Sequence, residues 1–257
     1  MRNLTRAPID FIKLESSEMP FNPKLNIFNE RGFGTIPEDE PDSDSVVRLL
    51  PGWDRDRDNY FELADLKDNL SEAQKVFQQL RDDYHIRIIP FKFAIGKDSE
   101  GKLAAYVIAK KAEGINLDSL SKEDLSPIEA ETLRQDLIET WSGLIDYYFD
   151  CLSSDQELFW DVFPAKQYVY GRVGKEEEKH PYMIDIEIRI TRGQQYLFRL
   201  ALSCLAEDPE AIGDSLSMDL SPIKEKLKLK ISEFLKQPNL VADASLKNNM
   251  RDYLNAL

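Results

Sequence analysis

The chain has 257 residues, 42% hydrophobic and 31% charged, which is long enough for one large globular domain or two lobes. Its formal net charge of −14 argues against a protein that binds the phosphate backbone of nucleic acids. No apolar run approaches the roughly 18 residues that span a bilayer, and the N-terminus lacks the apolar core of a secretion signal. We therefore expect a cytoplasmic protein without a membrane partner.

The cysteines and histidines exclude the commonest metal sites. Cys151 and Cys204 have no metal-ligand spacing and predict buried thiols. His85 and His180 are too few for a multi-histidine metal site.

The first part of the chain has the pattern of a small sheet with one helix. Strand-like segments bounded by turn residues lie near residues 31–36, 46–50, 86–95 and 103–109. Between the second and the third, apolar residues recur at helical spacing and predict an amphipathic helix over residues 66–84. We expect a mainly antiparallel sheet that packs against this helix.

The second part of the chain is helical. The motif SPIE at residues 126–129 combines a capping box with proline at the first helical position, so it predicts a helix that continues to about Cys151. Further helices are expected over residues 194–206, 221–235 and 243–257. The change of pattern near Gly114 predicts an α+β protein of two lobes, a β-rich antiparallel lobe of residues 1–112 and a helical lobe of residues 113–257.

A predicted hairpin over residues 167–188 carries the most informative polar residues. Asp185 lies inside the apolar run YMIDIE, and a dehydrated aspartate is costly unless a cation or a hydrogen-bond donor compensates it. Gln167 opens the other strand. An amide and a carboxylate that face each other would form a site for a divalent metal and the phosphates it carries. The alternative is an edge hairpin whose Asp185 points into water.

From about residue 30 to residue 190, the order of segments resembles the protein-kinase-like fold, in its aminoglycoside-phosphotransferase-like variety. RGFGTI is similar to the glycine loop, VVRLL to the strand with the phosphate-anchoring lysine, and NLSEAQKVFQQLRDDYHIRIIP to the first helix and the next strand. AYVIAKKAEGINL looks like the hinge, and FWDVFPAKQYVYG and YMIDIE stand in the places of the catalytic loop and the metal-binding aspartate. The resemblance implies a two-lobed kinase-like fold with ATP and Mg²⁺ as cofactors.

In the first lobe the resemblance assigns residues that bind the nucleotide. Gly32 and Gly34 would form the glycine loop, Arg48 stands where the lysine is expected, and Glu72 would pair with Arg48 across the helix–strand contact. Arg48 keeps the positive charge, although its planar fork does not replace a point ammonium freely. The alternatives are a plain hairpin for the two glycines and a solvated helix-start acid for Glu72.

In the second lobe the resemblance assigns the catalytic and metal-binding residues. Asp161 would orient the acceptor hydroxyl, and Gln167 and Asp185 would hold Mg²⁺. The catalytic loop departs from the family, because Phe159 replaces its histidine and the residue five after Asp161 is Lys166 instead of asparagine. The alternative for Asp161 is a turn or helix-cap acid.

Three hypotheses for the function follow. The first is an active ATP-dependent phosphotransferase, and the second is a pseudokinase that keeps the fold and acts as a binding or regulatory module. The third is an unrelated acidic protein-interaction domain. The replaced lysine, the replaced histidine and the irregular loop spacing narrowly favour the pseudokinase. A nucleotide as ligand and a protein as partner are both compatible with this hypothesis.

Overall fold

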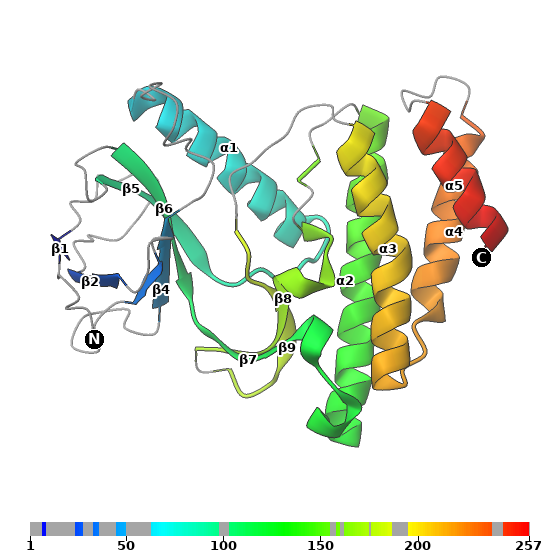
Figure 1. Ribbon diagram of the computed structural model, residues 1–257, viewed down its shortest axis with the longest axis horizontal. Helices are drawn as coiled ribbons and strands as arrows, with labels where there is room; N and C mark the ends of the chain where they lie inside the picture. Colours follow the sequence, from blue (N-terminus) through cyan, green and yellow to red (C-terminus); the bar gives the residue numbers. More distant parts are fainter. Residues whose placement is uncertain are drawn as a thin grey trace.

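The computed structural model shows an α+β protein with a larger sheet at one end, a bundle of helices at the other and a small sheet between them (Figure 1). The α+β class is therefore confirmed. The structure describes residues 7–8, 24–27, 33–35, 45–49, 63–97, 103–154, 158–159, 162–174, 176–186, 195–237 and 244–256.

The larger sheet is antiparallel and has the strand order β1-β2-β3-β4-β6-β5. Its strands are β1 (Ala7–Pro8), β2 (Lys24–Ile27), β3 (Phe33–Thr35), β4 (Ser45–Leu49), β5 (Phe91–Lys97) and β6 (Leu103–Lys110). Helix α1 (Leu63–Asp82) lies between β4 and β5 in the chain and buries Ala73 and Phe77. Phe77 contacts Phe93 of β5 at 6.3 Å between ring centroids, so the apolar stripe of α1 covers one face of this sheet.

The segment between α1 and β5, residues 83–90, is here called the connector. Residues 86–90 of the connector were predicted as the start of a strand, but β5 begins only at Phe91. The reason is that the backbone of the connector bonds to the other sheet: the Ile89 amide donates to the Met183 carbonyl at 3.0 Å, and the Met183 amide donates to the Arg87 carbonyl at 2.9 Å. The connector therefore ties the two sheets together.

The small sheet is antiparallel, with the order β7-β8-β9. Its strands are β7 (Ala112–Asn116), β8 (Tyr168–Val173) and β9 (His180–Met183). β7 was not predicted, since Gly114 was interpreted as a break. The glycine is instead required there: a Cβ on Gly114 would lie 2.1 Å from the Tyr170 carbonyl oxygen, so the backbones of β7 and β8 approach too closely for a side chain.

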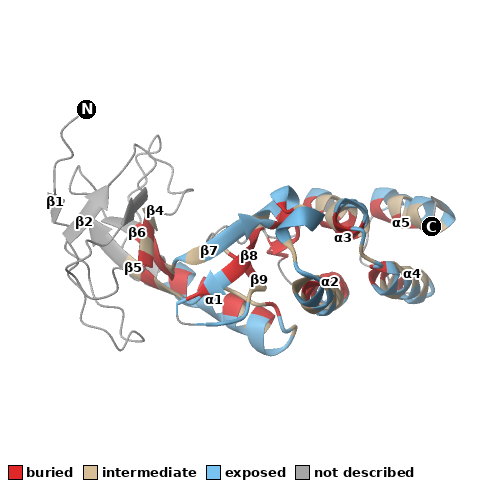
Figure 2. Ribbon diagram, turned by 90° about the horizontal axis from the view of Figure 1, so that it is seen from below, coloured by how far each residue is buried: buried red, intermediate tan, exposed pale blue. Residues whose placement is uncertain are grey.

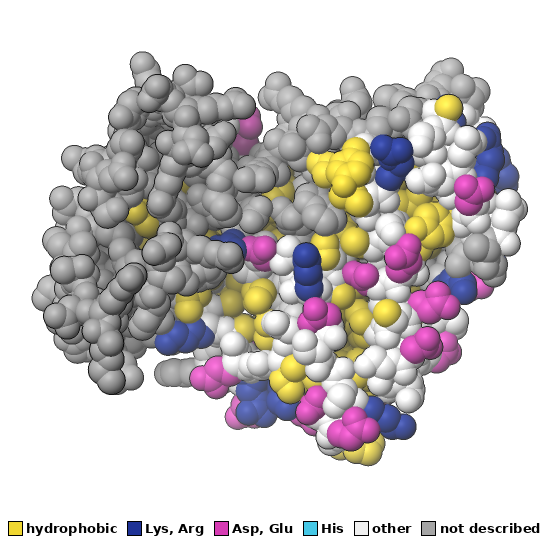
Figure 3. Space-filling view, viewed as in Figure 1, with side chains coloured by type: hydrophobic (Ala, Val, Ile, Leu, Met, Phe, Trp, Pro, Cys, Tyr) yellow, Lys and Arg dark blue, Asp and Glu magenta, His cyan; other side chains and the backbone are white. Residues whose placement is uncertain are grey.

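The helical part consists of α2 (Pro127–Ser154), α3 (Gln195–Leu216), α4 (Ser221–Leu235) and α5 (Ala244–Ala256). Their buried residues lie on the sides that face one another (Figure 2), whereas basic and acidic side chains are interspersed on the face shown in Figure 3.

The predicted capping box is confirmed, because the Glu129 carboxylate accepts from the Ser126 amide at 3.0 Å and the Glu129 amide donates to the Ser126 hydroxyl at 3.3 Å. Cys151 and Cys204 are free thiols, as predicted, but only Cys151 is buried, whereas Cys204 is half-buried. None of the helices in the described ranges combines the length and the apolar composition that a membrane crossing requires.

Candidate functional site

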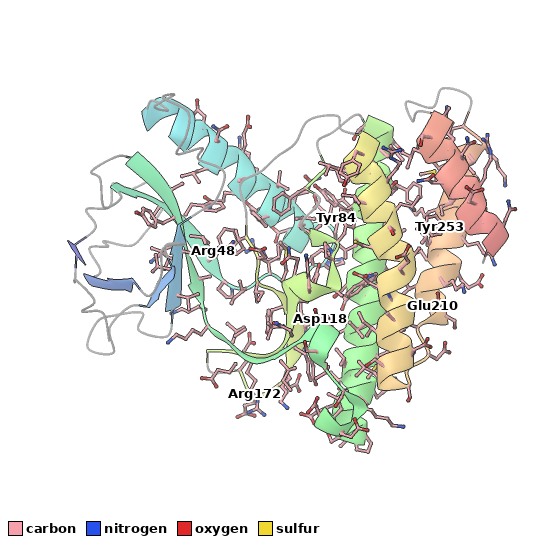
Figure 4. The ribbon with its side chains drawn as sticks, viewed as in Figure 1. Arg48, Tyr84, Asp118, Arg172, Glu210 and Tyr253 are labelled. Carbon is pink, nitrogen blue, oxygen red and sulfur yellow. The ribbon has the colours of Figure 1, made fainter. Side chains whose placement is uncertain are left out.

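The candidate site is the contact between Arg48 of β4 and Asp185, two residues after the end of β9. Arg48 donates through Nη1 to Oδ1 of Asp185 and through Nη2 to the carbonyl oxygen of Ile186, the latter at 2.6 Å. The two charged residues are 137 positions apart, and their side chains are 17% and 22% exposed. Figure 4 shows Arg48 extending from β4 toward the middle of the molecule. This contact joins the larger sheet to the segment that follows the small sheet.

The pattern of each strand explains why these side chains meet. Arg48 lies opposite Val107 in the register of β4 and β6, so it shares a sheet face with Val107, which is part of the core beneath α1. Asp185 lies between Ile184, which is half-buried, and Ile186, which is fully buried. A carboxylate in these surroundings needs a cation, and the guanidinium of Arg48 supplies it. Asp185 does not point freely into water.

The predicted partner of Arg48 was Glu72, and this prediction is wrong. Glu72 is exposed on α1, whereas Ala73, one position on, is buried against the sheet. Since consecutive helical residues are about 100° apart around the axis, a helix that buries Ala73 and Phe77 turns Glu72 away from the sheet. The cation of β4 therefore pairs with the carboxylate after β9.

Gln167 lies at the same end of the small sheet as Asp185 but not directly opposite it. The Gln167 carbonyl accepts from the Ile184 amide at 2.9 Å, which extends the pairing of β8 and β9 by one residue. Lys166 and Gln167 belong to a short 3-10 helix, Ala165–Gln167, so the strand register of β8 begins only at Tyr168. Magnesium ligation by Gln167 and Asp185 stays a prediction, and a metal ion at Asp185 would share its carboxylate with Arg48.

Of the remaining predicted site residues, Gly32 and Asp161 lie outside the described residues, and Gly34 pairs with Val47 within the larger sheet. The loop on the C-terminal side of Asp161 is held by α3, because the Ala165 amide donates to Oδ2 of Asp208 at 2.7 Å. Burial raises the pKa of the Asp208 carboxyl above its ordinary value, against the bond from Ala165, which lowers it. Sequence reasoning had assigned no role to Asp208.

A second polar cluster, which sequence reasoning missed, holds the start of β9. Oδ2 of Asp136 on α2 lies 2.6 Å from Nδ1 of His180 on β9, and its Oδ1 accepts from Arg87 of the connector at 3.2 Å. The Asp136 side chain is only 8% exposed. The three residues are 44 and 49 positions apart in the chain, so no local spacing indicates that they meet. We call Arg87, Asp136 and His180 the β9 cluster.

Neither a protein-family model nor a curated protein matches this chain.

Proposed function

We propose that the protein is a kinase-like module that binds a nucleotide beside Arg48 and Asp185 and acts by binding, as a pseudokinase does. The observation that carries the proposal is the contact between these two residues. In kinases, a cation on the strand before the first helix anchors the phosphates, and an aspartate after the later hairpin serves the metal. Arg48 precedes α1 and Asp185 follows the hairpin of β8 and β9, so both charges occupy corresponding places and touch.

The order of the elements supports the same proposal. The strands β2, β3, β4, β6 and β5 are adjacent in that order, and α1 is inserted between β4 and β5. The kinase resemblance implies the same succession along the chain, in which a helix separates the strand with the cation from the next strand. β7 follows this sheet directly and forms an edge of the small sheet with residues 113–116 exposed, so its outer edge has backbone groups that no strand pairs.

The contacts of Arg48 are the reason for proposing that the protein does not transfer phosphate. An active protein kinase needs the ion pair between the strand lysine and the helix glutamate, together with the metal-bound aspartate. Here the strand carries arginine, its charge is engaged by Asp185, and Glu72 is exposed. The active phosphotransferase stays the alternative, and retained transfer of a labelled γ-phosphate from ATP would establish it. Replacement of Asp161 by asparagine should then abolish transfer without affecting binding.

A thermal-shift titration with ATP tests the proposal. A ligand that binds only the folded state stabilises it by RT ln(1 + [L]/Kd), so about a hundredfold excess over Kd adds about 2.7 kcal/mol. We expect such a shift for the natural protein and a reduced one for Arg48→Gln. The matched control is Arg81→Gln, which removes another arginine–aspartate pair, Arg81 with Asp82, on the exposed surface of α1. If no purine nucleotide shifts the melting temperature, with or without Mg²⁺, the proposal is wrong and the unrelated interaction domain becomes the better hypothesis.

A further inference from the structure

We infer that Arg48 takes the place of a metal ion at Asp185: it neutralises this carboxylate and contacts a phosphate directly, so that nucleotide binding does not require Mg²⁺. The inference rests on the proposed function, because it specifies how the same site holds its ligand. It departs from the sequence-based expectation, in which Gln167 and Asp185 hold magnesium and the metal carries the phosphates.

The bonds of Arg48 show how one side chain serves both purposes. A guanidinium has five N–H donors in a rigid planar fork. One donor on Nη1 is used by Asp185 and one on Nη2 by the Ile186 carbonyl. The bonds to these two described partners leave further donors of the same fork for a third group. Arginine binds phosphate oxygens through paired, charge-assisted hydrogen bonds, so it can bridge Asp185 and a phosphate without a metal ion between them.

Electrostatics at Asp185 disfavours a divalent ion. Arg48 is permanently charged, and its bonds balance the single negative charge of Asp185 before any ligand arrives. A divalent ion on the same carboxylate would lie next to the guanidinium, and like charges at such a distance repel strongly where water is partly excluded. The side chains of Arg48 and Asp185 are only 17% and 22% exposed, so solvent screens this repulsion less than at the surface.

The backbone around Asp185 also fits a fixed arginine contact better than a metal site. Magnesium requires near-ideal octahedral geometry from oxygen ligands. The backbone carbonyl of the predicted second ligand, Gln167, accepts from the Ile184 amide. Gln167 also belongs to a short 3-10 helix, Ala165–Gln167, and not to β8, so no strand register sets its side chain opposite Asp185. The charged group that contacts Asp185 is therefore a guanidinium, whereas a magnesium site would need further oxygen ligands.

β9, the strand that precedes Asp185, is held by other elements, and this keeps the contact of Asp185 with Arg48 in place. β9 ends at Met183, and both backbone groups of Met183 are bonded to the connector. At the start of β9, His180 contacts Asp136 of α2. Asp185 is thus held only two residues from a strand that is tied to two other elements. A ligand at this site meets an arginine and a carboxylate that are already in contact, which reduces the entropy lost on binding.

The test is calorimetric titration of the full-length protein with ATP in two buffers, one with EDTA and one with excess Mg²⁺. We expect the dissociation constants of the natural protein in the two buffers to agree within about threefold. Arg48→Gln should weaken binding in EDTA by about tenfold or more, because it removes charge-assisted bonds to the phosphate. Arg48→Lys keeps the charge but loses the fork, and should bind about tenfold more tightly with Mg²⁺ than without it. Arg81→Gln is the control and should behave as the natural protein, and the circular dichroism of each variant verifies its fold.

The outcomes separate this inference from the function on which it rests. If the natural protein binds ATP only with Mg²⁺, the nucleotide-binding function stands and the role of Arg48 as the replacement for a metal is refuted. Equal binding in EDTA by Arg48→Gln and the natural protein also refutes it. If the natural protein binds neither ATP nor inorganic tripolyphosphate in either buffer, the proposed function and this inference both fail.

Discussion

Gly143 of α2 provides a sharp test of how the connector is held against the helical part. A Cβ built on this residue would lie 1.9 Å from the carbonyl oxygen of Tyr84 and 3.2 Å from Cδ1 of Ile86. Two effects of Gly143→Ala oppose each other. Alanine is intrinsically better than glycine inside a helix by about 1 kcal/mol. The overlap with the carbonyl oxygen is more than about 1 Å beyond ordinary contact, and it involves backbone rather than a flexible side chain.

The destabilisation by steric overlap should exceed the gain in helix propensity, because the connector is held by hydrogen bonds on both sides of the contact. The Ile86 amide donates to the Leu80 carbonyl at 3.0 Å, and the Tyr84 hydroxyl donates to Asp150 at 2.9 Å. Further along, the connector is paired with Met183. Overpacking of this kind costs about 1–3 kcal/mol or more. We place Gly143→Ala at the upper end and, after the gain in helix propensity, expect a net loss of about 2 kcal/mol.

Urea and thermal unfolding, followed by circular dichroism, measure the effect. In a domain of this size a loss of 1 kcal/mol lowers the melting temperature by about 2–4 °C, so we expect a decrease of about 4–8 °C. Gly213→Ala in α3 is the matched control, since its Cβ would lie 3.0 Å from the Met218 carbonyl oxygen. Its smaller overlap and the same gain in propensity should leave it within about 1 kcal/mol of the natural protein. A Gly143→Ala variant as stable as Gly213→Ala would refute the reasoning.

Three further substitutions test the polar contacts by urea unfolding. Asp208→Asn should be at least as stable as the natural protein at neutral pH, because burial disfavours the charge of the aspartate and asparagine still accepts from the Ala165 amide. Asp208→Ala leaves that amide without its acceptor and should lower the free energy of unfolding by about 1–2 kcal/mol. Asp136→Ala should lower the free energy of unfolding by about 2–3 kcal/mol, since it leaves His180 and Arg87 without the carboxylate that they share. Asp146 is partly buried, which raises its pKa, but two lysines of α4 outweigh burial and the pKa is lowered. A lowered pKa means that the ion pairs stabilise the protein above about pH 4 and lose this effect as the pH falls further. The loss of unfolding free energy in Asp146→Asn should therefore become smaller in acid. A loss that stays constant across this pH range would contradict the role of the two ion pairs.

Local patterns in the sequence predicted most of the helices and the strand pairs close in the chain. The capping box at residues 126–129 fixed the start of α2, because all its bonds lie within four residues. β7 escaped prediction because Gly114 weakens a strand by every local measure, and only the approach of β8 from more than fifty positions away explains the glycine. α3 extends beyond the predicted end and continues through Pro209, since packing of its apolar stripe outweighs one lost backbone bond.

The site shows where sequence reasoning reaches its limit. The sequence indicated that Asp185 needs a compensating charge and that Arg48 is a site residue, yet it paired Arg48 with Glu72 and Asp185 with Gln167. Each pairing joined residues of one lobe, whereas the observed contact joins residues 137 positions apart. Which face of a strand meets which element is decided by tertiary packing, and the same reason explains why the β9 cluster had no signal in the sequence.

Besides the pairing of β9 with β8, three other elements contact β9 and the residues after it, and this arrangement has a consequence for any ligand. β4 reaches Asp185 through Arg48, α2 reaches His180 through Asp136, and the connector pairs with Met183. A ligand that displaced Arg48 from Asp185 would break the only one of these contacts made by a strand of the larger sheet among the described residues. A ligand that bound Arg48 in place would strengthen it. Because coupling between two binding events is reciprocal, a phosphate held by Arg48 in its observed position should rigidify the junction of the two sheets, and a protein partner that recognises the rigid junction should in turn raise the affinity for the phosphate.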